Sequence, residues 1–182
     1  MRTLLKCFFV VVITLGMLVT VSVLKTPTES IEFTERSDLK VPKVCSVDTI
    51  VNPLSEEYRN FLRWLEVDHE LPEGILFAIM MRESSGRINV VSKAGAEGLF
   101  QFMPRTSESL GIDPYDPFEA GRGAATYLSY LLNYFDGRLE LAIAAYNAGM
   151  GNVRRYGNSI PPFHETQTYV VAIKQKINYY NL

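Results

Sequence analysis

Apolar and polar positions follow a helical period through most of the chain beyond Glu56. In the first such segment, Tyr58, Leu62 and Leu65 recur three or four residues apart, so they fall on one face of a helix. Similar patterns, most of them bounded by proline or glycine, are found at 72–83, 104–110, 118–135, 139–148 and 165–179. The pattern therefore predicts an all-α, or mainly α, domain.

Two segments differ from this general pattern. Residues 139–148 are largely apolar and rich in small side chains, which predicts a helix buried at the centre of the fold. The segment from Ile88 to Gly98 breaks the helical period with Asn89, Gly95 and Gly98. It predicts a loop, or a short strand pair, beside a cleft.

The amino-terminal part of the chain has a different composition. Cys7 to Leu24 contains no charged residue, comes close to the ~20 residues that cross a bilayer, and follows a basic start. Such basic residues stay in the cytoplasm, so we expect an N-terminal transmembrane helix in residues 1–25, an anchor rather than a cleaved signal. Residues 26–50 show no sustained periodicity and are interpreted as a linker, which leaves 51–182 as the folded domain.

Charge and composition exclude several function classes. The formal charge of the 182-residue chain is −2, and about −5 without the three basic residues of the leader. This argues against a nucleic-acid partner, because proteins that bind nucleic acid present a basic face. His69 and His164 stand in no metal-ligand spacing, so we expect no metal and no other cofactor. Cys7 lies in the leader and leaves Cys45 without an intrachain partner, so the fold is predicted to need no disulfide.

One carboxylate stands at the end of a segment that is otherwise apolar. Read as a helix that begins near Pro72, the segment places Leu76, Ile79 and Glu83 on one face. Burial disfavours the ionised form of a carboxyl group, so we expect a raised pKa and a proton that Glu83 can donate near neutral pH. Gly86 follows and can end the helix. The alternative is a solvated glutamate at a helix end.

Four short motifs occur in succession from Glu83 onward. They are Glu83-Ser84, Gly98-Leu99-Phe100-Gln101, Ala145-Tyr146-Asn147, and Glu165-Thr166 with Tyr169-Val170 shortly after. From about Leu71 to Tyr180 this order resembles the soluble lytic transglycosylase family, whose members have a goose-type-lysozyme-like fold and cleave the glycan strands of peptidoglycan. The sequence departs from the family pattern at Phe100, where methionine is usual, and we expect this exchange to change how a sugar ring packs. It also departs at Glu97, which adds a charge beside the site.

The resemblance implies a reaction that needs a single carboxyl group. Glu83 would first protonate the glycosidic oxygen and then accept the proton of the muramic acid's own C6 hydroxyl, which closes a 1,6-anhydro ring. Most glycoside hydrolases use two carboxyl groups instead. The resemblance also implies a set of residues that bind the sugar or support the acid: Ser84, Gln101, Tyr146, Asn147 and Glu165.

Structural alternatives stay open for these residues. Ser84 and Asn147 stand at predicted helix ends. Gln101 can brace the loop backbone, and Glu165 can cap the first turn of its own helix. For Gln101 and Glu165 a contact with the ligand is favoured. Tyr146 is expected to hold the acid by a hydrogen bond.

The sequence thus predicts a peptidoglycan lytic transglycosylase, anchored in the inner membrane, whose lysozyme-like domain (51–182) faces the periplasm. Its expected partners are glycan strands and, through residues 1–25, the membrane, and an envelope-spanning machine is left open as a further partner. One alternative is a muramidase that uses water, with Glu97 or Glu165 as its second carboxylate. Another is a non-catalytic glycan-binding component of a cell-envelope machine.

Overall fold

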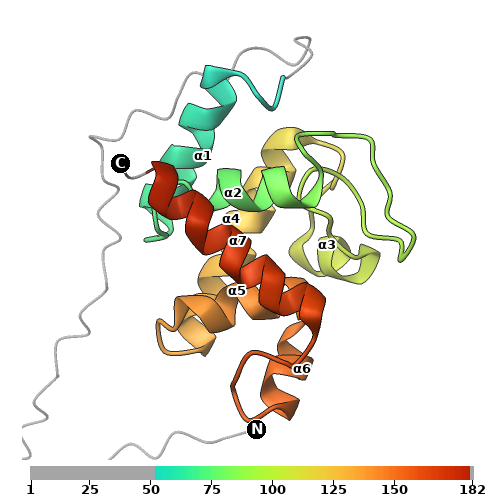
Figure 1. The fold of residues 1–182 in the computed structure, drawn as a ribbon. Coiled ribbons are helices and arrows are strands. Elements are labelled where there is room, and N and C mark those ends of the chain that lie inside the picture. Colours follow the sequence, from blue (N-terminus) through green and yellow to red (C-terminus); the bar gives the residue numbers. More distant parts are fainter. Residues whose placement is uncertain (1–51, 181–182) are drawn as a thin grey trace, which may run out of the picture. The chain divides into compact units, whose positions relative to one another are not determined.

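The helical pattern is confirmed in residues 52–180, the part of the chain that the computed structural model describes (Figure 1). Its elements are α1 (Glu56–Asp68), α2 (Ile75–Glu83), α3 (Pro104–Leu110), α4 (Pro117–Tyr134), α5 (Leu139–Ala148), α6 (Met150–Arg155) and α7 (His164–Tyr180). Within this part the chain forms no strand. The strand pair that we considered for 88–98 is reduced to two isolated bridges, Val91 with Glu97 and Glu97 with Phe102.

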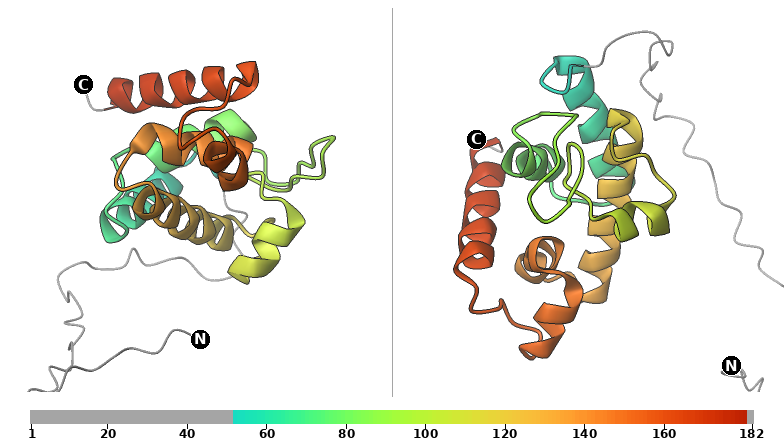
Figure 2. Two further views of the ribbon diagram at one scale, coloured as in Figure 1. Left: turned by 90° about the horizontal axis from the view of Figure 1, so that it is seen from below. Right: turned by 90° about the vertical axis from the view of Figure 1, so that its right-hand side faces the viewer.

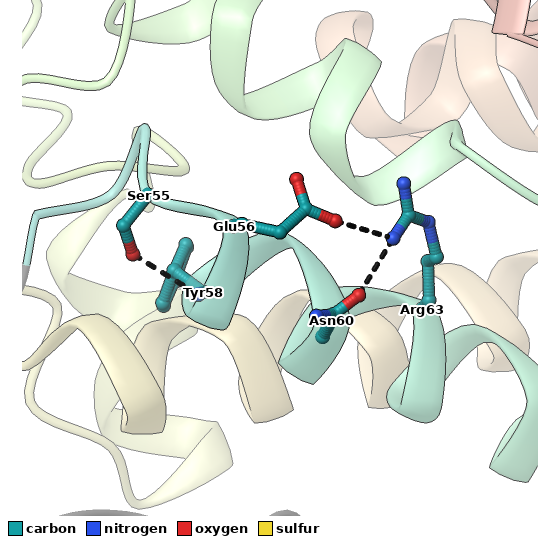
Figure 3. Close-up of polar contacts among 5 residues, drawn as sticks. All are labelled: Ser55, Glu56, Tyr58, Asn60 and Arg63. Carbon is teal, nitrogen blue, oxygen red and sulfur yellow. Dashed lines mark hydrogen bonds and ion pairs between the residues drawn. The ribbon is translucent and has the colours of Figure 1, made fainter.

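Helix α1 begins at a side-chain cap and is tied to α4. The Ser55 hydroxyl accepts a hydrogen bond from the Tyr58 backbone N–H at 3.2 Å (Figure 3), as serine does at many helix starts. The Tyr58 hydroxyl donates to the carbonyl of Pro117 at 2.6 Å, where α4 begins. Because Tyr58, Phe61 and Leu62 are buried, the apolar face of α1 becomes part of the core.

The predicted central helix is confirmed. Helix α5 spans 139–148, is buried from Leu141 to Ala145, and packs against α4, α6 and α7. Helix α7 lies across both α5 and α2, as Figures 1 and 2 show from different sides. The small side chains of α5 allow these close approaches, since packed helices come nearer to each other where the side chains between them are small.

Helix α2 differs from the prediction in two ways. It begins at Ile75, not at Pro72, and its N-cap is Gly74 in the left-handed conformation (φ 79°). It is also buried at every position from Ile75 to Met80, where we expected one apolar face. A helix that is apolar all round is buried all round, so Glu83 stands at the end of an element enclosed by α1, α4 and α7.

The segment between α2 and α3 is shaped by close backbone contacts. It extends from the C-terminal end of α2 to the side of the molecule where α3 lies (Figure 1). Gly98 has a positive φ of 75°, and a Cβ atom there would stand 1.8 Å from the carbonyl oxygen of Pro114. Any other residue would therefore push this segment away from the turn that precedes α4.

No helix among residues 52–180 is long enough and apolar enough to cross a membrane. The anchor predicted in residues 1–25 and the linker predicted in 26–50 lie outside the described residues.

Candidate active site

A cavity of about 730 Å³ lies where α2, α5, α7 and the segment before α3 meet. Five of the six predicted site residues line it: Glu83, Gln101, Tyr146, Asn147 and Glu165. The sixth, Ser84, is not among its lining residues and is only 1% exposed. The fold therefore brings together side chains that are up to 82 positions apart in the sequence.

Glu83 is the last residue of α2 and is partly buried at the cavity wall. Burial raises the pKa of its carboxyl group. A hydrogen bond from Tyr169 and the charge of Arg82 oppose this shift, and the charge of Glu165 adds to it. The carboxyl group also stands at the negative end of the α2 dipole, which disfavours its ionised form. Burial is the largest of these influences, and the raised pKa favours a protonated Glu83 beside an open cavity.

The hydrogen bond that we expected from Tyr146 is made by Tyr169 instead. The Tyr169 hydroxyl donates to Glu83 Oε1 at 2.6 Å, whereas the Tyr146 hydroxyl donates to the backbone carbonyl of Phe100 at 3.1 Å. Burial raises the pKa of both phenols well above the ordinary value, so both act as donors. Tyr146 therefore holds the segment between α2 and α3, which forms the loop wall of the cavity. Tyr169 holds the acid Glu83.

Sequence reasoning gave Tyr169 no role, although a signal was present. Tyr169 follows Glu165 by four residues, and side chains with this spacing share one face of a helix. Glu165 lines the cavity, so the same face of α7 carries Tyr169 toward Glu83.

Gln101 braces the loop and also lines the cavity. Its backbone is left-handed (φ 50°), and its side-chain nitrogen Nε2 donates to the carbonyls of Val90 at 3.2 Å and Gly98 at 2.9 Å. The brace that we held as the structural alternative is thus present. Both bonds use the amide nitrogen, and the amide oxygen of Gln101 is the atom left for a ligand. Its contact with a sugar stays a prediction.

Asn147 and Ser84 make contacts typical of helix ends. Asn147 Oδ1 accepts a hydrogen bond from the Thr166 hydroxyl at 2.8 Å, which joins the end of α5 to the start of α7. The Ser84 hydroxyl donates to the carbonyl of Met80 at 3.3 Å and accepts from the N–H of Gly86 at 3.2 Å. These bonds favour the structural alternative for Ser84, while Asn147 combines such a bond with a place in the cavity wall.

The two candidates for a second carboxylate lie in different surroundings. Glu165 lines the cavity, and its charge raises the pKa of Glu83. Glu97 is not among the lining residues and lies beside Tyr115, where burial and then the charge of Glu97 raise the pKa of the phenol. Glu165 is therefore the one of these two that faces the acid.

This geometry agrees with what is found in known proteins. The family model for the transglycosylase SLT domain matches residues 62–166. The chain belongs to the transglycosylase SLT domain family. The match covers α2, the loop wall, α5 and the start of α7, and so includes all six predicted site residues.

Several relatives of this SLT domain are known. The soluble lytic murein transglycosylase of Escherichia coli K12 is 31% identical over 146 residues, which cover 68% of this chain and 23% of the relative. The transglycosylase of Enterobacteria phage PRD1 is 31% identical over 124 residues, 64% of this chain and 44% of the relative. The membrane-bound lytic murein transglycosylase F of Pseudomonas fluorescens is 33% identical over 86 residues, 43% of this chain and 18% of the relative.

Solved structures share the fold. An inactive mutant of the lytic transglycosylase Slt of Pseudomonas aeruginosa has a TM-score of 0.61 and 31% identity, over 71% of this chain and 24% of that one. The 70 kDa soluble lytic transglycosylase of Escherichia coli has a TM-score of 0.58 and 30% identity, over 68% and 24%. The SLT domain thus spans less than half the length of each of these relatives.

This SLT domain departs from its family at Phe100, and this residue lies in the core. Phe100 is fully buried and is not among the lining residues of the cavity. We expected the replacement of methionine to change how a sugar ring packs. The aromatic ring of Phe100 instead packs beside that of Phe102 inside the protein. Of residues 99–103, the ones that do line the cavity are Gln101, Phe102 and Met103.

Proposed function

We propose that this SLT domain is a peptidoglycan lytic transglycosylase that cleaves the bond between N-acetylmuramic acid and N-acetylglucosamine and forms 1,6-anhydro-N-acetylmuramic acid. The observation that carries the proposal is the Glu83 carboxyl group, whose pKa is raised by burial and which is held by Tyr169 at the wall of a large cavity. A general acid for a glycosidic oxygen needs these two properties, a retained proton and access to substrate.

The reaction uses Glu83 twice. Its proton passes to the bridging oxygen as the bond from C1 of the muramic acid breaks, and the departing N-acetylglucosamine keeps that oxygen as a hydroxyl. The Glu83 carboxylate then takes the proton of the C6 hydroxyl, and O6 bonds to C1. The reaction consumes no water, and Glu83 is protonated again at its end. Tyr169 stabilises the carboxylate formed between the two steps, because its hydrogen bond favours the ionised form.

The intramolecular route is favoured over attack by water. Well-oriented intramolecular nucleophiles reach effective molarities of about 10⁵ M or more, whereas water offers roughly 55 M. The C6 hydroxyl therefore captures C1 wherever the cavity holds the ring in a suitable position. The hydrogen-bonded loop wall around Gln101 and Tyr146 supplies such a rigid surface.

One observation favours a second candidate. Glu165 faces the cavity together with Glu83, as a base that activates water in a muramidase would. Digestion of purified sacculi in H₂¹⁸O separates the two activities. The lytic reaction gives muropeptides that are lighter by one water than reducing-end products and carry no ¹⁸O. A digest dominated by reducing ends labelled with ¹⁸O would contradict the lytic assignment and support the muramidase.

We further propose that the domain acts on the periplasmic side of the inner membrane, held there by residues 1–25. The uncharged run in that segment and its basic start support the proposal. Full-length protein should remain with the membrane fraction after high-salt and alkaline washing. Recovery of a shortened, soluble, active species would show that the segment is cleaved as a signal.

A further inference from the structure

A second buried carboxyl group lies outside the cavity. Glu66, on α1, is 1% exposed. Its Oε2 accepts a hydrogen bond from the backbone N–H of Gly74 and its Oε1 accepts one from the N–H of Leu76, both at 2.7 Å. Both oxygens of Glu66 are therefore bonded to the first turn of α2, the helix that ends at Glu83.

Helix α2 needs such a partner. The first N–H groups of a helix have no acceptor within the helix, and a buried N–H group without a partner is costly. The N-cap of α2 is Gly74, which has no side chain to offer, and Leu76 is fully buried. The Glu66 carboxylate thus supplies from α1 the contact that serine or aspartate supplies at an ordinary helix start.

The contacts of Glu66 identify α2 as its partner, rather than a cation. The guanidinium of Arg63 is bonded to Glu56 at 3.1 Å and to Asn60 at 2.6 Å along α1 (Figure 3). That of Arg59 lies over the Phe77 ring, 4.5 Å from its centroid.

Burial makes this carboxylate costly to ionise. It raises the pKa of Glu66 to about 7, although the bonds from Gly74 and Leu76 lower it. The charge of Glu73 raises this pKa further and that of Arg63 lowers it. A buried apolar residue would avoid the cost of ionisation, so the advantage of Glu66 has to lie in where it places α2.

We propose that Glu66 is a positioning residue that fixes the start of α2 and thereby sets Glu83 against Tyr169 at the other end. The proposal rests on the lytic activity proposed for Glu83. Helix α2 has nine residues, about 13 Å at 1.5 Å per residue. A shift or rotation of so short a helix at its start is carried to Glu83, and a hydrogen bond of 2.6 Å tolerates little displacement.

The test compares Glu66→Gln with Glu73→Gln in the full chain. Glu66 and Glu73 line the same small cavity of about 70 Å³ between α1 and α2, but only Glu66 accepts hydrogen bonds from α2. The amide group that Glu66→Gln introduces would present a donor to one of the two N–H groups. On sacculi we expect Glu66→Gln to lower kcat about fivefold to tenfold with KM within twofold. Glu73→Gln should keep wild-type kcat and KM.

A second measurement does not depend on turnover. In wild type the amide signals of Gly74 and Leu76 should titrate near pH 7 in NMR spectra, together with the carboxyl of Glu66. In Glu66→Gln this titration should vanish, and the ¹³C signal and titration midpoint of the Glu83 carboxyl should move. In Glu73→Gln the Glu83 signal should stay in place. If Glu66→Gln does not fold, Glu66→Asp replaces it, since it keeps the charge but lacks the reach.

Two results would overturn the proposal. In one, Glu66→Gln leaves both kcat and the Glu83 signal unchanged, and in the other Glu73→Gln alters them equally. If wild type releases no muropeptide at all, the proposed activity fails, whereas the Glu83 carboxyl signal still decides whether Glu66 positions Glu83.

Discussion

Glu66 and Glu83 lie at opposite ends of the same helix, and burial raises the pKa of both carboxyl groups. At the start of α2, Glu66 is 1% exposed and both of its oxygens accept backbone hydrogen bonds. At the end of α2, Glu83 has a bond from one phenol and borders a cavity of about 730 Å³. A raised pKa therefore does not distinguish a structural carboxyl group from an acid catalyst, whereas the access of one oxygen to an open cavity does.

The direction of the helix separates the two groups further. Backbone N–H groups at the start of a helix favour a negative charge, and the carbonyl groups at its end disfavour one. Glu66 therefore receives the hydrogen bonds that an ionised carboxylate needs. Glu83 stands where a proton is more easily retained. Variants of the two residues should therefore have different effects. A Glu83 variant changes the chemical step, whereas a Glu66 variant changes the position of α2 and the stability of the fold.

The largest effect is expected for Glu83→Gln. The amide keeps the size of the side chain but cannot donate a proton and then accept another, so release of muropeptides from sacculi should fall about 10³-fold or more. Binding to sacculi in a pelleting assay and the melting temperature should stay near wild type. Glu97→Gln is the control, since Glu97 is not among the lining residues. Near-normal turnover of Glu83→Gln would remove the basis of the proposed function.

The next largest effect is the pH dependence of the contribution that Glu66 makes to the free energy of unfolding. Its folded pKa of about 7 lies above the ordinary value of 4.5, so the folded state binds the proton more tightly than the unfolded state. Its stabilising contribution is complete below about pH 4.5 and is lost as pH rises through 7. The shift corresponds to about 3 kcal/mol.

This contribution is measured as a difference between two proteins. The free energy of unfolding from urea titrations should fall in wild type between about pH 5 and 7.5, more steeply than in Glu66→Gln. Glu83 contributes in the same direction, so the same comparison is made in a Glu83→Gln background, where this contribution is absent. Parallel curves for the two proteins would mean that Glu66 has an ordinary pKa in the folded state.

A smaller effect is expected for Tyr169→Phe. The phenol bond lowers the pKa of Glu83, so its removal should raise this pKa, and the alkaline limb of the pH profile of kcat should move to higher pH. Turnover should also fall about tenfold, because a hydrogen bond to a charged group contributes about 1.5–3 kcal/mol. Tyr127→Phe is the matched control, as Tyr127 lines the cavity without a bond to Glu83. A limb that moves to lower pH would contradict the assigned role.

Most helices could be predicted because their apolar period is local information. The predicted spans 104–110 and 139–148 coincide with α3 and α5, and 118–135 is shifted by one residue from α4. Helix α6 was missed, since Val153 is the one buried residue in its six positions and gives no period. The start of α2 was missed because it depends on Glu66, a contact between two helices.

The sequence identified the residues of the site better than the hydrogen bonds between them. The motif order identified five of the residues that line the cavity. The partner of Glu83, however, depends on how α7 crosses α2, which no local pattern contains. Glu66 did leave a signal in the sequence. It follows Tyr58 and Leu62 at intervals of four, so it lies on the apolar face of α1, where a charged residue needs a partner.

The smallest effect is expected for Glu165→Gln, and its sign is opposite to that of Tyr169→Phe. The charge of Glu165 raises the pKa of Glu83. Its removal should therefore lower this pKa, and the alkaline limb of the kcat profile should move to lower pH. At a pH well below that limb, the rate should stay within a few-fold of wild type, since Glu83 remains protonated there and the lytic reaction requires no second carboxylate. The products should still be anhydro-muropeptides free of ¹⁸O. A loss as deep as that of Glu83→Gln at every pH, with ¹⁸O-labelled reducing ends from wild type, would assign Glu165 as the base of a muramidase.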